Sequence, residues 1–161
     1  MIRIRKSETA DTRTCDVTKV TKEQLLESSR QHIGDVGKGI AFFAGRLTEA
    51  ASVHDYDKLT AIDWFHADFT TEILKPDGWL ANHYRIHRHH LGDCPIKGNS
   101  RDIGVPADVN LIDVLEMVAD CVMAGMGRAG SVFPIALSDD LLQRALANTV
   151  ELLKSQVQVE G

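Results

Sequence analysis

Apolar residues recur at helical spacing through the first long segment of the chain, from residue 21 to about residue 51. Thr21 and Gln24 have the spacing of a capping box, which predicts that a helix begins there and ends near Ala51. Gly34 and Gly37 remove side chains from one face, so another helix or a ligand can approach closely. The apolar face consists of Leu25, Leu26, Ile33, Val36, Ile40, Phe43 and Leu47.

The remaining pattern predicts four more helices. Thr60 and Asp63 offer a cap for a helix through residues 61–74, which stops at a turn over residues 75–78. A third helix runs from residue 79 to about residue 90 and precedes a loop rich in Gly, Pro and Asp at 91–108. Ser138 caps the last helix, which extends to about Val157. The fourth helix, from residue 109, has one apolar stripe: Leu111, Leu115, Val118 and Val122.

These elements predict an all-α fold, a compact bundle of about five helices in a single domain over residues 21–161. Residues 1–20 form a polar segment without periodicity, in which Ile2 and Ile4 suit a short edge strand or a flap. No pair of strands is convincing. The apolar residues Leu141, Leu142, Ala145 and Leu152 in the last helix suit either the core or the contact surface of a homodimer.

Composition narrows the class of protein. The chain has 161 residues, of which 43% are hydrophobic and 25% charged, and a net charge of −5. This charge argues against broad binding to nucleic acid but not against a small phosphate-bearing ligand. Three cysteines without a paired spacing favour a reducing cytoplasm, and no apolar run reaches the ~20 residues that span a bilayer.

Two short segments carry candidate chemistry. The sequence "HYRIHRHH" at residues 83–90 contains four of the seven histidines in the chain. On a helix His83, His87 and His90 share one face, and His89 lies about a third of a turn away. The sequence "HDYDK" at residues 54–58 places a histidine beside an aspartate, with a lysine three residues later.

The order of these motifs resembles the HD superfamily of metal-dependent hydrolases. His32 in the first helix, the pair His54-Asp55 and Asp113 in the fourth helix follow the superfamily order. The segment "HDYDK", of the form HDxxK, resembles the HDIGK variant of the superfamily's cyclic-dinucleotide phosphodiesterases. The segments "HDYDK", "HYRIHRHH" and "NLIDVLEMVAD" together resemble a family of small phage and bacterial HD-like proteins without an assigned function. The resemblance covers about residues 30–125 and implies an all-helical HD domain, located in the host cytoplasm if phage-encoded.

The resemblance implies a divalent transition metal, Fe, Mn or Zn, as one or two ions. Its ligands would be His32, His54, Asp55 and Asp113, with Asp55 suited to bridge two ions. His83 with His89 or His90 would complete a second position. Asp55 would be catalytic together with Lys58 and Arg88, whose charges, with that of Arg85, would neutralise phosphate oxygens. The implied activity is hydrolysis of a nucleotide or another small phosphate ester by a metal-activated water.

Other interpretations stay open. Each residue has an ordinary role when taken alone: His32 as a core histidine, Asp113 or Asp120 as a carboxylate favoured by the helix dipole, and the histidine-rich segment as a surface anion patch. Among functions, the alternatives are a dinuclear-iron oxygenase of the HD type and a non-catalytic protein that binds and sequesters a nucleotide. The sequence specifies neither the substrate nor the oligomeric state.

Overall fold

The computed structural model describes residues 1–6, 16, 18–71, 78–91 and 105–160. Helices dominate this part of the chain, so the predicted all-α class is confirmed. The chain divides into two compact units, residues 1–46 with 150–161 and residues 47–149. None of the helices in the described ranges is long and apolar enough to cross a bilayer.

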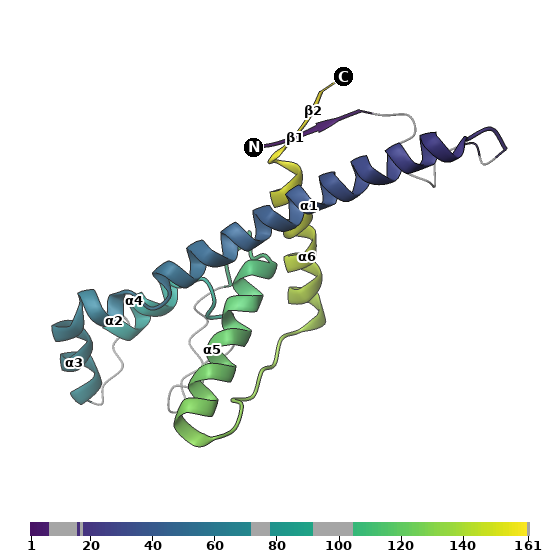
Figure 1. The fold of residues 1–161 in the computed structure, drawn as a ribbon. Helices are drawn as coiled ribbons and strands as arrows, with labels where there is room; N and C mark the ends of the chain where they lie inside the picture. The colour runs from purple at the N-terminus through teal and green to yellow at the C-terminus, as the bar shows by residue number, and fades with distance from the viewer. Residues whose placement is uncertain (7–15, 17, 72–77, 92–104, 161) are drawn as a thin grey trace. The chain divides into compact units, whose positions relative to one another are not determined.

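The first unit joins the two ends of the chain. Strand β1 (Ile2–Arg5) pairs in parallel with β2 (Val157–Glu160), and Ile2 is opposite Val157 (Figure 1). Helix α1 (Lys22–Val53) begins at the predicted capping box: Thr21 N donates to Gln24 Oε1 over 2.9 Å, and Gln24 N donates to Thr21 Oγ1 over 3.2 Å. The sequence analysis found no convincing pair of strands, and this prediction was wrong. A pairing between segments far apart in the chain leaves no local signal in the sequence.

The second unit contains short helices α2 (Asp57–Thr60), α3 (Ile62–Thr70) and α4 (Trp79–Ile86), followed by α5 (Leu111–Ala129). Helix α6 (Asp139–Lys154) begins in this unit, where Ser138 Oγ accepts a hydrogen bond from Leu141 N as predicted. Leu141 and Ala145 of α6 are buried in the core of this unit. Leu115, which the sequence placed on the apolar stripe of the fourth helix, is 50% exposed. The buried core residues are Leu91, Val109, Val114, Met117, Leu141 and Ala145.

Helix α4 differs most from the prediction. It ends at Ile86 rather than near His90, because His87 adopts an extended conformation (φ −99°, ψ 110°). Its start is fixed from another helix: Asp68 of α3 accepts a hydrogen bond from Leu80 N over 3.2 Å. Thr60 makes no cap for α3 and instead donates to the carbonyl of Tyr56. The predicted helix end at 71–74, the turn and most of the 91–108 loop lie largely outside the described residues.

Candidate metal centre

The turn between α1 and α2 positions the histidine–aspartate pair. His54 follows the last residue of α1, and Asp55 has a positive φ of 51°, the left-handed region that L-residues rarely adopt. Such a conformation is costly, and it persists where the surrounding structure holds it. Here it brings both side chains to a group that we call the histidine–carboxylate cluster: His54, Asp55, Asp57, His83, His87, His89, His90, Glu116 and Asp120.

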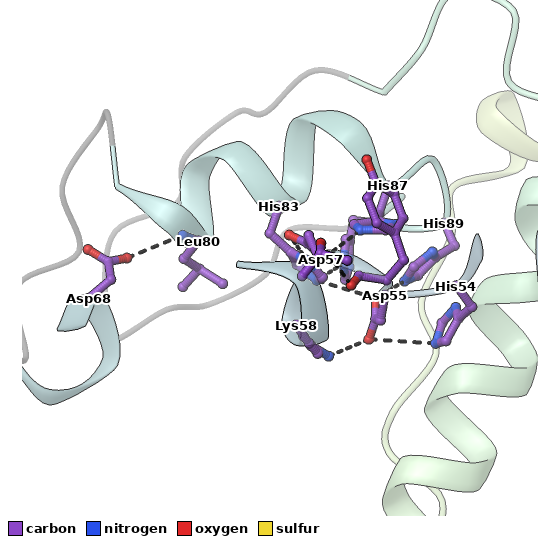
Figure 2. Close-up of polar contacts among 12 residues, drawn as sticks. His54, Asp55, Asp57, Lys58, Asp68, Leu80, His83, His87 and His89 are labelled. Atoms are coloured by element: carbon purple, nitrogen blue, oxygen red, sulfur yellow. Dashed lines mark hydrogen bonds and ion pairs between the residues drawn. The ribbon is translucent and has the colours of Figure 1, made fainter. Parts of the chain in front are cut away.

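The two oxygens of Asp55 have different surroundings. Oδ2 contacts the Lys58 ammonium and lies 3.6 Å from His54 Nε2, and Figure 2 shows these two side chains approaching it from opposite sides. Oδ1 is buried and lies 3.4 Å from His83 Nε2 and 3.5 Å from His89 Nε2. Among the described residues it has no hydrogen-bond partner. A buried carboxylate oxygen without a partner is unfavourable unless a cation or a donor occupies the space beside it.

Two imidazole nitrogens lie beside this oxygen, and the three atoms together have the spacing that a metal ion requires. His83 Nε2 and His90 Nε2 are 2.9 Å apart, and Asp55 Oδ1 is 3.4 Å from the former. Ligands at about 2.1 Å from one ion, in tetrahedral or octahedral geometry, are separated by about 3.0–3.4 Å. The set Asp55, His83 and His90 therefore fits a transition-metal ion.

His89 is a further buried donor beside this position. Within the described ranges neither of its ring nitrogens forms a hydrogen bond, although Nδ1 lies 2.9 Å from Glu116 Oε1. The ring is 1% exposed, so solvent does not satisfy these atoms either. A buried imidazole without hydrogen bonds suits the role of a metal ligand, because the ion would bind a ring nitrogen that otherwise has no partner.

Two further carboxylates orient the imidazoles. Asp57 is buried and accepts from His83 Nδ1 over 2.9 Å and from His87 Nε2 over 2.7 Å (Figure 2). Glu116 of α5 lies 2.9 Å from His54 Nδ1 and pairs with it. When Nδ1 of a histidine donates to a carboxylate, its Nε2 keeps the lone pair that binds a metal. Asp57 and Glu116 thus leave His83 Nε2 and His54 Nε2 as acceptors turned toward Asp55.

A second set of imidazole and carboxylate donors adjoins the first. His54 Nε2 lies 3.6 Å from Asp55 Oδ2 and 3.8 Å from Asp120 Oδ1. Each oxygen of Asp55 therefore faces a different set of donors. The sets in which one possible ligand atom from each residue lies within 4.8 Å of the others are Asp55–His83–His90, Asp55–His87–His89, Asp57–His83–His87, His54–His89–Glu116 and His54–Asp55–Asp120.

The electrostatics of the cluster favour a cation. Burial lowers the pKa of His83 and His89, and burial, followed by the electrostatic effect of the nearby His89 and His83 rings, lowers the pKa of His90 to about 2. These imidazoles are therefore neutral at pH 7 and have lone pairs available. Burial alone would raise the pKa of Asp55, but Lys58, followed by His54 and His83, lowers it overall.

Several carboxylates gather in the cluster. Asp55, Asp57, Glu116 and Asp120 lie within the donor sets, and Lys58 is the cationic side chain that contacts Asp55. Burying such a concentration of negative charge is costly, and a divalent ion offsets it.

Five of the residues that the sequence predicts as metal ligands lie together in this cluster. His54, Asp55, His83, His89 and His90 all belong to its donor sets, and Lys58 contacts Asp55. The proposed ligand roles themselves stay predictions.

Besides Lys58, three predicted site residues lie outside these sets: Asp113, Arg88 and His32. Asp113 is the third helical residue of α5, where its side chain accepts from Asn110 N in a capping box. Both of its oxygens also bind Arg88, at 2.8 Å each from Nε and Nη2. Arg88 is thereby engaged by Asp113 and Asp108 instead of facing the donor sets. His32 is exposed on α1 in the first unit, so the geometry of the second unit leaves its role a prediction.

Four other members of the donor sets were not assigned a role from the sequence. Asp57 lies two residues after Asp55 in "HDYDK", and His87 lies inside the histidine-rich segment. Glu116 and Asp120 are four residues apart on α5 and therefore share one face of that helix. This spacing was the signal that the sequence offered for Glu116 and Asp120, because two neighbouring carboxylates on one face of a mostly apolar helix need a partner of opposite charge.

Two cavities adjoin the cluster. One, of about 730 Å³, is lined by residues that include Lys58, His83, His90 and Asp120. The other, of about 320 Å³, is mainly apolar and has His54, Glu116 and Asp120 in its wall. Cys121 also lines the larger cavity, but burial and the charge of Asp120 raise the pKa of its thiol. Cys121 is therefore a protonated thiol at neutral pH and a poor nucleophile.

Comparison of the chain with protein-family models, with curated proteins and with solved structures finds no match. The likeness to the HD superfamily accordingly stays an expectation drawn from the motifs. What the structure establishes is coarser: a buried group of histidines and aspartates able to hold a metal ion, compatible with a metal-dependent enzyme.

Proposed function

We propose that the chain is an HD-type metal-dependent phosphohydrolase, which hydrolyses a nucleotide or another small phosphate ester through a metal-activated water. The observation that supports this most is the buried Asp55 Oδ1, which lacks a hydrogen-bond partner among the described residues and faces Nε2 of His83 and His89. The mixed imidazole and carboxylate donors suit Fe, Mn or Zn better than Ca²⁺ or Mg²⁺.

Each residue of the cluster has a separable task in this reaction. A bound divalent ion supplies Lewis acidity and lowers the pKa of a water molecule. Asp57 holds His83 with Nε2 toward the ion, and Glu116 does the same for His54. Lys58, at the wall of the larger cavity, places a positive charge where a phosphate oxygen would lie beside Asp55.

This proposal does not assign Arg88 the phosphate-binding task that the sequence suggested. Its guanidinium forms a bidentate pair with Asp113 and also contacts Asp108. These two carboxylates raise its pKa further, so the guanidinium stays protonated throughout the working range of pH. Arg88 therefore fixes the start of α5 relative to the histidine turn that follows α4.

The first test is Asp55→Asn, which keeps the size of the side chain and removes its charge. Protein loaded with Mn²⁺, Co²⁺ or Fe²⁺ is incubated with a panel of nucleotides, cyclic ones included, and phosphate or nucleoside release is measured. We expect turnover by the native chain and a loss of at least about a hundredfold in Asp55→Asn, since a metal ligand and the bridge between both donor sets are altered.

Asp63→Asn, an exposed carboxylate in the first turn of α3, serves as the matched control and should retain full activity. Circular dichroism of both variants checks that they fold. If metal binds and every substrate class stays intact, the hydrolase proposal is wrong. Recovery of tightly bound but unchanged nucleotide would instead support the sequestering protein.

One observation favours a second candidate, a dinuclear-iron oxygenase. The sets Asp55–His83–His90 and Asp55–His87–His89 each combine two imidazoles with one carboxylate, the donor composition that non-haem iron oxygenases use. Iron in the purified protein with a mixed-valent magnetic signal would support this candidate. Zinc or manganese in its place, with hydrolysis, would exclude it.

A further inference from the structure

The larger cavity is more spacious than a phosphate group requires. Its volume is about 730 Å³, within the range of about 300–1,000 Å³ that small-molecule sites occupy. One water molecule takes about 30 Å³, and a phosphate group displaces only a few waters. With the phosphate placed at Lys58, His83 and His90, most of the cavity is left for the organic part of a ligand.

The wall of this remaining space is aromatic. Phe65 stacks on Trp79 with ring centres 4.0 Å apart, and Trp79 stacks on His83 at 4.6 Å. Phe69 packs edge-on against Phe65 and is 75% exposed, an unusual exposure for a phenylalanine at the edge of a cavity. The rings thus form a continuous row from α3 to the histidine–carboxylate cluster.

Phe133, which follows α5, also lines this cavity, and its place depends on Gly125. The segment after α5 folds back so that Phe133 N donates to Cys121 O over 3.3 Å. A Cβ atom at Gly125 would lie 2.5 Å from Ser131 O and 2.6 Å from Phe133 N, so only glycine permits this approach. Phe133 lines the cavity together with Cys121 and Ala124 of α5.

Arg128 adds a positive charge to the same cavity. It is exposed in the last turn of α5, and the structure gives it no ion pair within the part of the chain described. In this respect it differs from Arg88, which is engaged by two carboxylates. A solvated guanidinium at the opening of a cavity attracts an anionic ligand and can stack on a planar one.

We propose, building on the phosphohydrolase function above, that this cavity selects phosphate compounds that carry a planar aromatic ring. Phe133 contacts the ring and determines specificity, and Arg128 attracts the anion. Aromatic stacking by one side chain changes affinity by roughly tenfold or more, whereas a charge at the opening affects all anionic ligands alike. The two residues therefore have distinguishable effects.

The test measures binding to the full chain by calorimetry, with adenosine 5′-monophosphate and ribose 5-phosphate as probes. The ligand is recovered afterwards and checked for hydrolysis. The native chain is expected to bind adenosine 5′-monophosphate about tenfold more tightly than ribose 5-phosphate. Phe133→Ala should abolish most of this preference, and Phe133→Leu, which keeps the apolar bulk, should abolish a similar share. Arg128→Gln should weaken both probes by a similar factor.

Two matched controls lie outside the cavity wall in the second unit. Met126→Ala truncates another apolar side chain of α5, and Arg144→Gln removes another exposed arginine. Neither should alter the preference between the two probes. Equal affinity of the native chain for both probes, or a preference that survives both Phe133 variants, would overturn this proposal.

The outcomes also separate this proposal from the one on which it rests. Preferential binding of adenosine 5′-monophosphate without hydrolysis of any phosphate compound would retain the aromatic cavity and reject the hydrolase. Hydrolysis of aliphatic and aromatic phosphates at equal efficiency, with equal affinity, would retain the hydrolase and reject the aromatic cavity.

Discussion

At the scale of single residues, the cluster depends on carboxylates that orient its imidazoles. Asp57 is 4% exposed and accepts hydrogen bonds from both His83 and His87. Burial by itself raises the pKa of Asp57, but the bonds from His83 and His87 lower it overall. The carboxylate therefore stays ionised and keeps the His83 ring in one tautomer and orientation.

We expect Asp57→Asn to weaken metal binding by about 10–100-fold, because an amide orients and polarises the His83 ring less than a carboxylate does. Competition with a fluorescent chelator measures the affinity, and Asp63→Asn is again the exposed control. The number of bound ions should stay unchanged. A lower stoichiometry would show that Asp57 is itself a ligand, and an unchanged affinity would show that it has no part in metal binding.

The sequence revealed some of these residues better than others for a physical reason. "HDYDK" and "HYRIHRHH" are dense in titratable groups, so their convergence on a common site was predictable from composition and spacing. The sequence could not show which of Asp113 and Asp120 belongs to the cluster, because the two residues are seven positions apart and share one face of α5. What separates them is Arg88, which binds Asp113 from a turn whose path no local pattern encodes.

At the scale of elements, the prediction and the structure differ mainly in where the helices begin and end. The helical pattern of residues 79–90 would place His83, His87 and His90 along one side of a rod. Instead α4 ends at Ile86, and a turn closed by His90 N to His87 O and Leu91 N to His89 O brings the later histidines back toward His83. Tertiary contacts with Asp57 and Asp55 override a moderate helical propensity here.

Two glycines of α5 test how the segment after this helix is held. Gly125→Ala should destabilise the chain by about 1–3 kcal/mol, because its Cβ would overlap the backbone of Ser131 and Phe133. Gly127→Ala should be neutral or stabilise by up to about 1 kcal/mol, since no atom lies within 4 Å of its Cβ position and alanine favours the helix. Urea unfolding of both variants measures this difference. Similar midpoints would contradict the close approach at Gly125.

At the scale of the whole molecule, the second unit places a polar cluster beside a modest apolar core. Its buried apolar residues come mainly from α5, α6 and the segments before α5, whereas α2, α4 and the histidine turn meet through hydrogen bonds and ion pairs. Neutral imidazoles make that arrangement possible, since several protonated rings within hydrogen-bond distance of one another would repel. The stability of the chain should therefore depend on pH in a range that carboxylates do not explain.

The direction of this pH dependence follows from the histidines whose pKa values are shifted in the folded chain. Burial lowers the pKa of His83, His89 and His90 in the folded chain, whereas the unfolded chain keeps values near 6.5. Above pH 6.5 both states are neutral, and these residues add no pH dependence. As pH falls below 6.5, the unfolded chain takes up protons that the folded chain refuses, so each histidine removes up to about 1.4 kcal/mol per pH unit.

Asp55 and Asp57, whose pKa values are lowered in the folded state, add their own loss only as pH falls below about 3.8. The interval from pH 6.5 to 4.5 thus isolates the histidines. We expect the urea midpoint of the metal-free chain, held in chelator, to fall steadily across this interval, and His90→Gln to fall less steeply. Bound metal should raise the midpoint most at neutral pH, because ion and proton compete for the same Nε2 lone pairs. A midpoint independent of pH over this interval would mean that the rings are protonated or exposed in the folded chain, and the donor set argued above would not exist in solution.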